Sequence, residues 1–192
     1  MCGIVVVFTP RQPTRARTVE AMCRAIRHRG PDDEGYLLAD GGFAMPLAGA
    51  DTPQAVLDAL VPSQPQGVIA EQGEREATLL LGHRRLSIVD LSPLGHQPMR
   101  RGAHLWAVYN GEIYNHVELR VELEKLGHHF ESHSDTEVLL AAYTQWGPQA
   151  LNRCNGMWAL AIYDAQRRTL FVARDRFGVK PLYVWQGSDG AV

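Results

Sequence analysis

The second residue, Cys2, is the first candidate for chemistry. Removal of Met1 would place a free α-amine, with a reference pKa of about 7.7–8.0, on the same residue as a thiol. The amine could take the thiol proton, directly or through one water, and later protonate a departing amine. Cys2 would then be nucleophile and base together. The alternative is a small apolar residue that opens a strand.

Attack on an amide also needs hydrogen-bond donors for the oxygen that becomes negatively charged. The Asn110 side-chain amide and the Gly111 backbone N–H could converge on such an oxygen. Each donor of this kind stabilises a transition state by about 3 kcal/mol. The alternative is an ordinary Asn-Gly turn, and the run at 104–109 predicts a strand that would end in a hairpin at this point.

Two charged residues could hold a substrate that carries a carboxylate and an ammonium. Arg85 could form a bidentate pair with a carboxylate, and in a strand its neighbour Arg84 should point to the opposite face. Asp135, at the start of a predicted helix, could accept a hydrogen bond from an ammonium, although an acidic residue there also complements the helix dipole. The polar turn at 29–33 is explained equally well by a functional role and by solvation.

Composition excludes several classes of partner. Lys and Arg number 19 against 21 acidic residues, and a net charge of −2 provides no basic field for nucleic acid or an anionic membrane surface. The apolar run at 3–9 is too short to span a bilayer and has no basic residues before it. Three scattered cysteines favour a reducing compartment. We expect a cytoplasmic protein that binds neither nucleic acid nor membrane.

The sequence also argues against a metal site. It contains no Cys-x-x-Cys pair, and His128 and His129 are adjacent rather than three or four residues apart. No metal is therefore expected in this chain.

The elements that must position these residues alternate between strands and helices. A strand at 3–9 lies directly behind Cys2 and precedes a helix at 18–29. A Ser134-x-x-Glu137 capping box opens a helix at 135–146, and another helix is predicted at 117–126. Apolar runs predict further strands at 78–81, 86–89, 104–109, 157–163, 169–174 and 182–185. The fold class is α+β.

The stretch from about 37 to 81 is rich in proline and glycine and reads as irregular. We interpret about 40–77 as an insertion, and expect deletion of 45–75 to leave the fold intact. A turn at 187–192 suggests that the chain is a fragment whose next strand lies beyond Val192.

Six segments, in order, resemble the N-terminal glutaminase domain of glutamine-dependent asparagine synthetases. That family comprises class II glutamine amidotransferases with an N-terminal nucleophile (Ntn) hydrolase fold. The resemblance extends over nearly all of residues 1–192, read as one glutamine amidotransferase domain. The segments are MCGI at the start, RHRGPDDEG at 27–35, LGHRRLSIVDLSPLGHQPM at 81–99, YNGEIYNH at 109–116, SDTEVLLAAY at 134–143 and ARDRFGVKPLY at 173–183.

The resemblance implies a four-layer αββα sandwich with the N-terminal strand at its centre. It makes Cys2 the nucleophile that attacks the side-chain amide of L-glutamine, releases ammonia and leaves a γ-glutamyl thioester for water to hydrolyse. It also assigns binding roles: Arg85 to the α-carboxylate, Asp135 and Glu112 to the α-ammonium, backbone atoms of Leu86, Ser87, Ile88 and Val89 to the pocket lining, and Asn110 with Gly111 to the oxyanion hole.

The ATP-binding synthetase domain of the family is not found in these residues. They contain no Gly-rich phosphate loop, so ATP and Mg²⁺ are assigned to a missing C-terminal synthetase domain, and no cofactor is expected in this one. That synthetase domain is the expected partner, and a homodimer is left open. The acceptor could be aspartate or another compound, since similar proteins serve antibiotic and polysaccharide pathways.

Two other functions stay open. If Met1 were retained, the α-amine would be blocked, and the chain would be a non-catalytic binding or regulatory module. A different cysteine Ntn amidase would act on acyl amides but not on glutamine.

Overall fold

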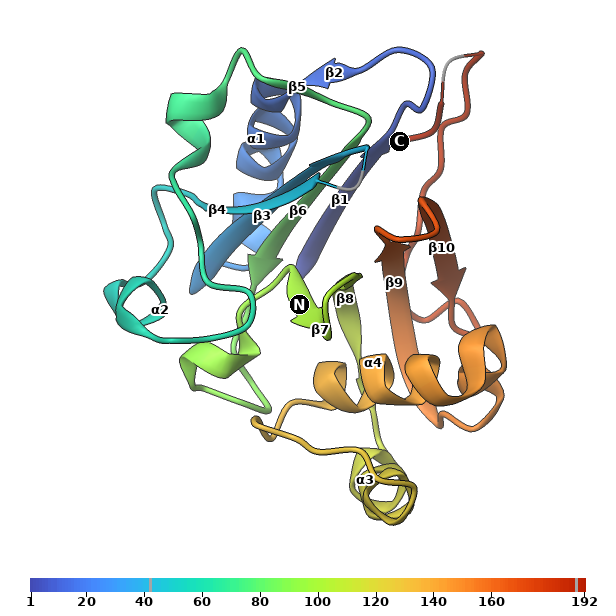
Figure 1. The fold of residues 1–192 in the computed structure, drawn as a ribbon. Coiled ribbons are helices and arrows are strands. Elements are labelled where there is room, and N and C mark those ends of the chain that lie inside the picture. Colours follow the sequence, from blue (N-terminus) through green and yellow to red (C-terminus); the bar gives the residue numbers. More distant parts are fainter. Residues whose placement is uncertain (42, 189) are drawn as a thin grey trace.

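The computed structural model describes residues 1–41, 43–188 and 190–192. Two four-stranded antiparallel sheets stack face to face, and helices cover their outer faces (Figure 1). This is the α+β, four-layer αββα sandwich expected from the resemblance, which the structure confirms.

The first sheet has the order β1 (Gly3–Phe8), β6 (Leu79–Arg85), β3 (Asp33–Asp40) and β4 (Phe43–Ala48). Helix α1 (Ala16–Ala25) packs on its outer face, where Val19 and Cys23 are fully buried. Alternation along β1 directs Val5 and Val7 toward this helix layer. It directs Ile4, Val6 and Phe8 toward the second sheet. The apolar run after Cys2 therefore anchors the N-terminus between two layers.

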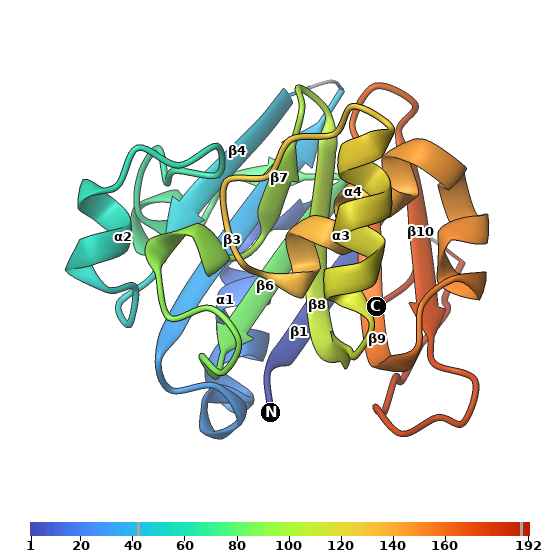
Figure 2. The same ribbon diagram turned by 90° about the horizontal axis from the view of Figure 1, so that it is seen from below.

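The second sheet has the order β10 (Thr169–Arg174), β9 (Gly156–Asp164), β8 (Leu105–Ile113) and β7 (Met99–Arg101). Helices α3 (His116–Lys125) and α4 (Asp135–Trp146) lie across its outer face (Figure 2). Leu123 of α3 and Leu139 of α4 are fully buried against this sheet.

A third apolar layer lies between the sheets and includes Leu37, Leu81, Trp106 and Val108. Strands β3 and β6 are covered on both faces, so every residue of β6 and all of β3 except its last residue are buried.

Short elements complete the chain. Strands β2 (Thr14–Arg15) and β5 (Glu76–Ala77) form a small ladder, and α2 (Gln54–Asp58) is a single short helix. Four 3₁₀ segments are formed by Arg27–Arg29, Ile69–Gln72, Pro93–Gly95 and Gly147–Asn152 among the described residues.

The stretch expected to be irregular is ordered in large part, and that expectation was wrong. β4 pairs with β3 along its whole length, and Leu47 and Ile69 are buried in the core beneath α1. Deletion of 45–75 would remove these contacts, so we no longer expect it to be neutral. Gly42, in the same stretch, lies outside the described residues.

The N-terminal strand was expected at the centre of the sandwich, and β1 lies in one of the two inner layers, at the end of the strand order of its sheet. β1 hydrogen-bonds to β6 on one side, while on the other Phe8 forms a single bridge with Ala191. The strand expected at 182–185 does not form among the described residues, where Trp185 exchanges backbone hydrogen bonds with Val192. Asp189, in the expected terminal turn, is not among the described residues.

Two further local predictions were wrong. Asn110 and Gly111 do not turn: β8 continues through them to Ile113, because β9 provides paired residues opposite both. The strand expected at 86–89 is also absent, since β6 ends at Arg85.

The helix at 135–146 is confirmed, but its capping box is incomplete. The Ser134 hydroxyl accepts the Thr136 N–H, whereas the Glu137 carboxylate accepts from Glu131 and Ser132 rather than from Ser134.

Candidate active site

A cavity of about 80 Å³ lies where β1 begins, β6 ends and α4 begins. Gly3 pairs with Arg84, so the antiparallel register sets Cys2 opposite Arg85. β8 and the segment that follows β10 complete the wall. The cavity brings together most of the predicted site residues: Cys2, Arg85, Leu86, Ile88, Val89, Asn110, Gly111, Glu112 and Asp135.

Ser87 is the exception. Its backbone N–H donates to Asp32 at 2.8 Å, and Ser87 is not part of the cavity wall.

Cys2 is half-buried and lines the cavity. Its Sγ lies 3.4 Å from the Leu86 nitrogen, which donates to it, and 3.6 Å from the Leu86 oxygen. Burial raises the pKa of the Cys2 thiol, while the Leu86 hydrogen bond and the positive charges of the N-terminus, Arg85 and Lys180 act to lower it. The Arg29 guanidinium also donates to the Cys2 carbonyl at 3.1 Å.

Arg85 is buried and held from two sides. Its guanidinium donates to the Ser92 carbonyl at 3.1 Å and to the Asp90 carbonyl, and it lies 3.9 Å from the Asp33 carboxylate. A guanidinium has five N–H groups, so donors remain for a carboxylate. A Cβ at Gly95 would collide with this guanidinium and would displace it.

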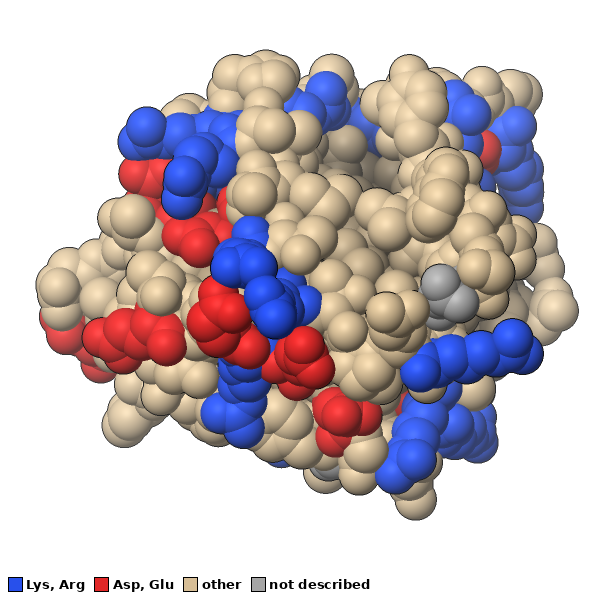
Figure 3. Space-filling model, turned by 90° about the horizontal axis from the view of Figure 1, so that it is seen from above, with Lys and Arg blue, Asp and Glu red and all other residues tan. Residues whose placement is uncertain are grey.

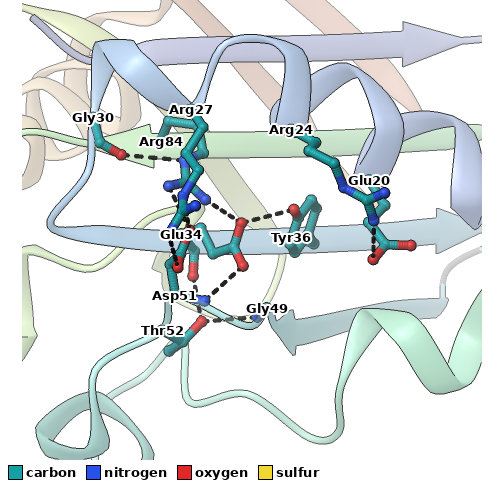
Figure 4. Close-up of polar contacts among 10 residues, drawn as sticks. All are labelled: Glu20, Arg24, Arg27, Gly30, Glu34, Tyr36, Gly49, Asp51, Thr52 and Arg84. Carbon is teal, nitrogen blue, oxygen red and sulfur yellow. Dashed lines mark hydrogen bonds and ion pairs between the residues drawn. The ribbon is translucent and has the colours of Figure 1, made fainter.

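Arg84 points to the opposite face of β6, as the alternation predicted. It donates to the Gly30 carbonyl at 3.1 Å and to Asp51 at 2.8 Å, and it pairs with the buried Glu34 (Figure 4). Arg84 therefore belongs to a structural ion-pair network, and only Arg85 faces the cavity.

Asn110 is buried on β8, and Gly111 follows it. The N–H groups of Tyr109 and Ile113 point away from β9, because they donate to Gln97 and Asp135. Alternation gives Gly111, between them, the same orientation. Its N–H is thus directed to the cavity side of the strand. A side chain at 111 would meet the Met157 carbonyl and the Tyr109 ring.

Asp135 is the first residue of α4 and is buried. Its carboxylate accepts the Tyr109 hydroxyl and the Ile113 N–H, each at 3.0 Å. Burial raises the pKa of Asp135, although these two hydrogen bonds act in the opposite direction. Glu112 is half-buried in the cavity wall nearby.

The turn at 29–33, for which solvation was an equal explanation, contacts the site. Arg29 binds the Cys2 carbonyl, and the Asp32 N–H donates to the Arg85 carbonyl at 3.0 Å. A Cβ at Gly30 would collide with the backbone of Arg84 and Arg85. The turn therefore joins the nucleophile to the end of β6.

Sequence reasoning missed Tyr109, Gln97 and Lys180, which also line the cavity. Lys180 stands in the segment 173–183 that carried part of the resemblance, but nothing local indicates that its side chain is buried. Its place depends on how the segment after β10 folds back.

The described residues include no group of three or more His, Cys, Asp or Glu side chains placed to hold a metal ion. Across those same residues, no helix is both long and apolar enough to cross a membrane. On the face shown in Figure 3, basic and acidic side chains lie next to one another at the edge of a broad uncharged area.

Comparison with known proteins identifies the family. A family model described as a glutamine amidotransferase domain matches residues 1–74 and 66–192. The chain belongs to this family. Asparagine synthetase [glutamine-hydrolyzing] 3 of Bacillus subtilis (strain 168) is 47% identical, over 98% of this domain and 25% of the relative. Asparagine synthetase B [glutamine-hydrolyzing] of Escherichia coli (strain K12) is 33% identical, over 99% of the domain and 28% of the relative.

A solved structure supports the fold. Glutamine phosphoribosylpyrophosphate amidotransferase from B. subtilis, complexed with ADP and GMP, aligns over 100% of this glutamine amidotransferase domain and 41% of that chain. The TM-score is 0.72 at 21% identity. The domain spans only about a quarter to a third of the curated asparagine synthetases that it matches.

Proposed function

We propose that this glutamine amidotransferase domain hydrolyses L-glutamine to glutamate and ammonia, with Cys2 as the nucleophile after removal of Met1. The observation that carries the proposal is the single cavity that Cys2 shares with Arg85, Asn110 and Asp135. The cavity contains a nucleophile, an amide donor, a cation and an anion that one bound amino acid could contact together.

The acylation step follows from these groups. The freed α-amine takes the proton from Sγ, and the thiolate attacks the side-chain amide carbon of glutamine. A C–S bond forms while the carbonyl π electrons move to oxygen. The Asn110 amide and the Gly111 N–H donate to that oxyanion, at about 3 kcal/mol for each donor.

Collapse of this intermediate breaks the C–N bond. The α-ammonium gives its proton to the leaving nitrogen, so ammonia departs and a γ-glutamyl thioester remains on Cys2. Water then attacks the thioester, with the neutral α-amine accepting its proton. Cleavage of the C–S bond releases glutamate, and the α-ammonium returns the proton to the Cys2 sulfur.

The α-carboxylate and α-ammonium of glutamine match charged side chains that line the cavity. Arg85 would bind the α-carboxylate, and Asp135 with Glu112 would bind the α-ammonium. Backbone atoms near Leu86, Ile88 and Val89 would line the substrate. Met1 is part of the cavity wall, so its removal would enlarge the cavity at the nucleophile.

The ammonia would serve an ATP-dependent amidation in a synthetase domain outside these residues, such as formation of asparagine from aspartate. The names of the similar proteins from B. subtilis and E. coli support this acceptor. ATP and Mg²⁺ would bind that domain and not this one. An acceptor from an antibiotic or polysaccharide pathway would use the same glutaminase chemistry. The three cysteines, all free, favour a cytoplasmic setting.

The test measures ammonia and glutamate from L-glutamine, beside an intact mass that reports Met1. Processed protein should form both products, and Cys2→Ala should form neither. Cys23→Ala is the matched control, since Cys23 is buried beneath α1, and it should stay active if it folds. Glutamine binding without hydrolysis by processed protein would instead support the binding module.

A further inference from the structure

One buried cation in the cavity has no role in the scheme above. Lys180 is 6% exposed, and it lines the cavity with Cys2 and Asn110. Among the described residues, no carboxylate lies within ion-pair distance of its ammonium. The Lys180 nitrogen is not among the buried polar atoms that lack a partner, so the ammonium at the end of this buried side chain reaches the cavity. A cation placed there can act on the other groups that line the cavity.

The segment that carries Lys180 is held firmly. The buried Asp175 carboxylate accepts the backbone N–H groups of Phe177, Val179 and Lys180 at 3.1, 2.9 and 2.9 Å. Arg174 donates to the Lys180 carbonyl at 2.8 Å. These bonds fix the backbone on both sides of the lysine, so the side chain enters the cavity from a defined position.

The residue type is informative as well. The chain has 19 basic residues, of which only Lys125 and Lys180 are lysine. Lys125 lies exposed in the last turn of α3. A lysine carries a compact point charge, whereas an arginine presents a broad planar fork suited to carboxylates. A compact charge fits a cavity of about 80 Å³ beside a single sulfur atom.

The other charged groups of the site that have a proposed role are assigned to the substrate, whereas Lys180 is not. The titratable or charged groups that also line the cavity, besides the N-terminus and Cys2, are Arg85, Asp90, Tyr109, Glu112 and Asp135. In the proposed complex, the substrate carboxylate neutralises Arg85 and the substrate ammonium neutralises the acidic pair. Lys180 is the cavity cation that this scheme does not assign to the substrate, and its charge acts on Cys2 in the direction that favours the thiolate.

We propose that Lys180 is a positioned cation that stabilises the Cys2 thiolate before glutamine is attacked. The proposal rests on Cys2 as the nucleophile. Lys180 takes no part in the proton transfer, and the thiol proton passes to the α-amine.

The test follows alkylation of Cys2 by iodoacetamide as a function of pH, without glutamine, with the modified peptide measured by mass spectrometry. Cys23 and Cys154 are buried and should react slowly. Lys180→Met and Lys180→Gln should move the midpoint to higher pH. A shift of one pH unit slows alkylation about tenfold below the midpoint. The matched control Lys125→Met should retain the wild-type midpoint.

Alkylation of Cys2 does not require glutamine hydrolysis, so the experiment tests the role of Lys180 even if the protein fails to hydrolyse glutamine. Unchanged midpoints in folded Lys180→Met or Lys180→Gln would overturn the proposal. So would a higher KM for glutamine with an unchanged midpoint, because Lys180 would then bind substrate. Thermal unfolding identifies any variant that does not fold, and the other neutral variant then decides.

Discussion

Replacement of Arg84 by methionine should destabilise the domain far more than replacement of Arg24, although both arginines form ion pairs on the α1 side of the first sheet (Figure 4). The Arg84 and Glu34 side chains are 1% and 7% exposed. Arg24 and Glu20 are 74% and 24% exposed and lie 3.3 Å apart on one helix. Burial is the main difference between the two pairs.

The expected magnitude follows from what Arg84→Met leaves behind. Removing one partner of a buried ion pair costs about 3–5 kcal/mol, because the other charge stays buried. Glu34 would keep two hydrogen bonds, from the Asp51 N–H at 2.8 Å and the Tyr36 hydroxyl at 3.0 Å. We therefore expect the lower end, about 3 kcal/mol. The exposed helix pair of Arg24 contributes about 0.3–0.5 kcal/mol.

Urea unfolding followed by circular dichroism measures both variants. With an m-value of about 2 kcal/mol/M, a loss of 3 kcal/mol lowers the midpoint by about 1.5 M. A double variant that also carries Glu34→Leu should recover much of the loss, since no charge then remains buried. If Arg84→Met changed the free energy of unfolding no more than Arg24→Met does, the reasoning from burial would be refuted.

Three further predictions concern the site and its support. Asn110→Ala should lower kcat for glutamine hydrolysis by about 10²–10³, as expected for loss of an oxyanion donor, and an unchanged kcat in folded protein would remove Asn110 from that role. Gly95→Ala should raise KM for glutamine, because the new Cβ would displace the Arg85 guanidinium; steady-state kinetics showing a wild-type KM would contradict this. Arg84, together with Arg27, holds the pKa of Asp51 below its usual range. The stability that Asp51 contributes is thus full above the unfolded pKa of about 3.9 and is lost as pH falls through the lower folded value, so wild type and Asp51→Asn should converge in stability during acid titration.

The local sequence pattern was sufficient to predict the helices and strands whose packing in the structure agrees with the spacing of their apolar residues. The capping residue Ser134 and the apolar residues after it predicted α4 from 135 to 146, and the run at 169–174 predicted β10. The alternation of side chains also separated Arg84 from Arg85 before any partner of either was known. These features depend on backbone geometry within a few residues.

The local sequence pattern gave wrong predictions where pairing with another strand overrides the local conformational preference. Asn110 and Gly111 favour a turn in isolation, but β9, far along the chain, extends the ladder past them and leaves the Gly111 N–H for the cavity. Similarly, the proline-rich stretch after β3 forms β4 because β3 and the residues beneath α1 provide pairing and burial.

The sequence by itself determined the αββα layering, the family and the chemical identity of the nucleophile, the arginine and the amide donor, since these follow from residue type and motif order. Only the tertiary structure decided that β1 lies at the end of its sheet, that Ser87 is not part of the cavity wall, and that the turn at 29–33 binds Cys2. The burial of Lys180 beside the nucleophile belongs to the same group. Each of these depends on contacts between segments far apart in the chain. In such contacts, burial and the identity of the partner group, rather than the residue type, determine the role of a charged side chain.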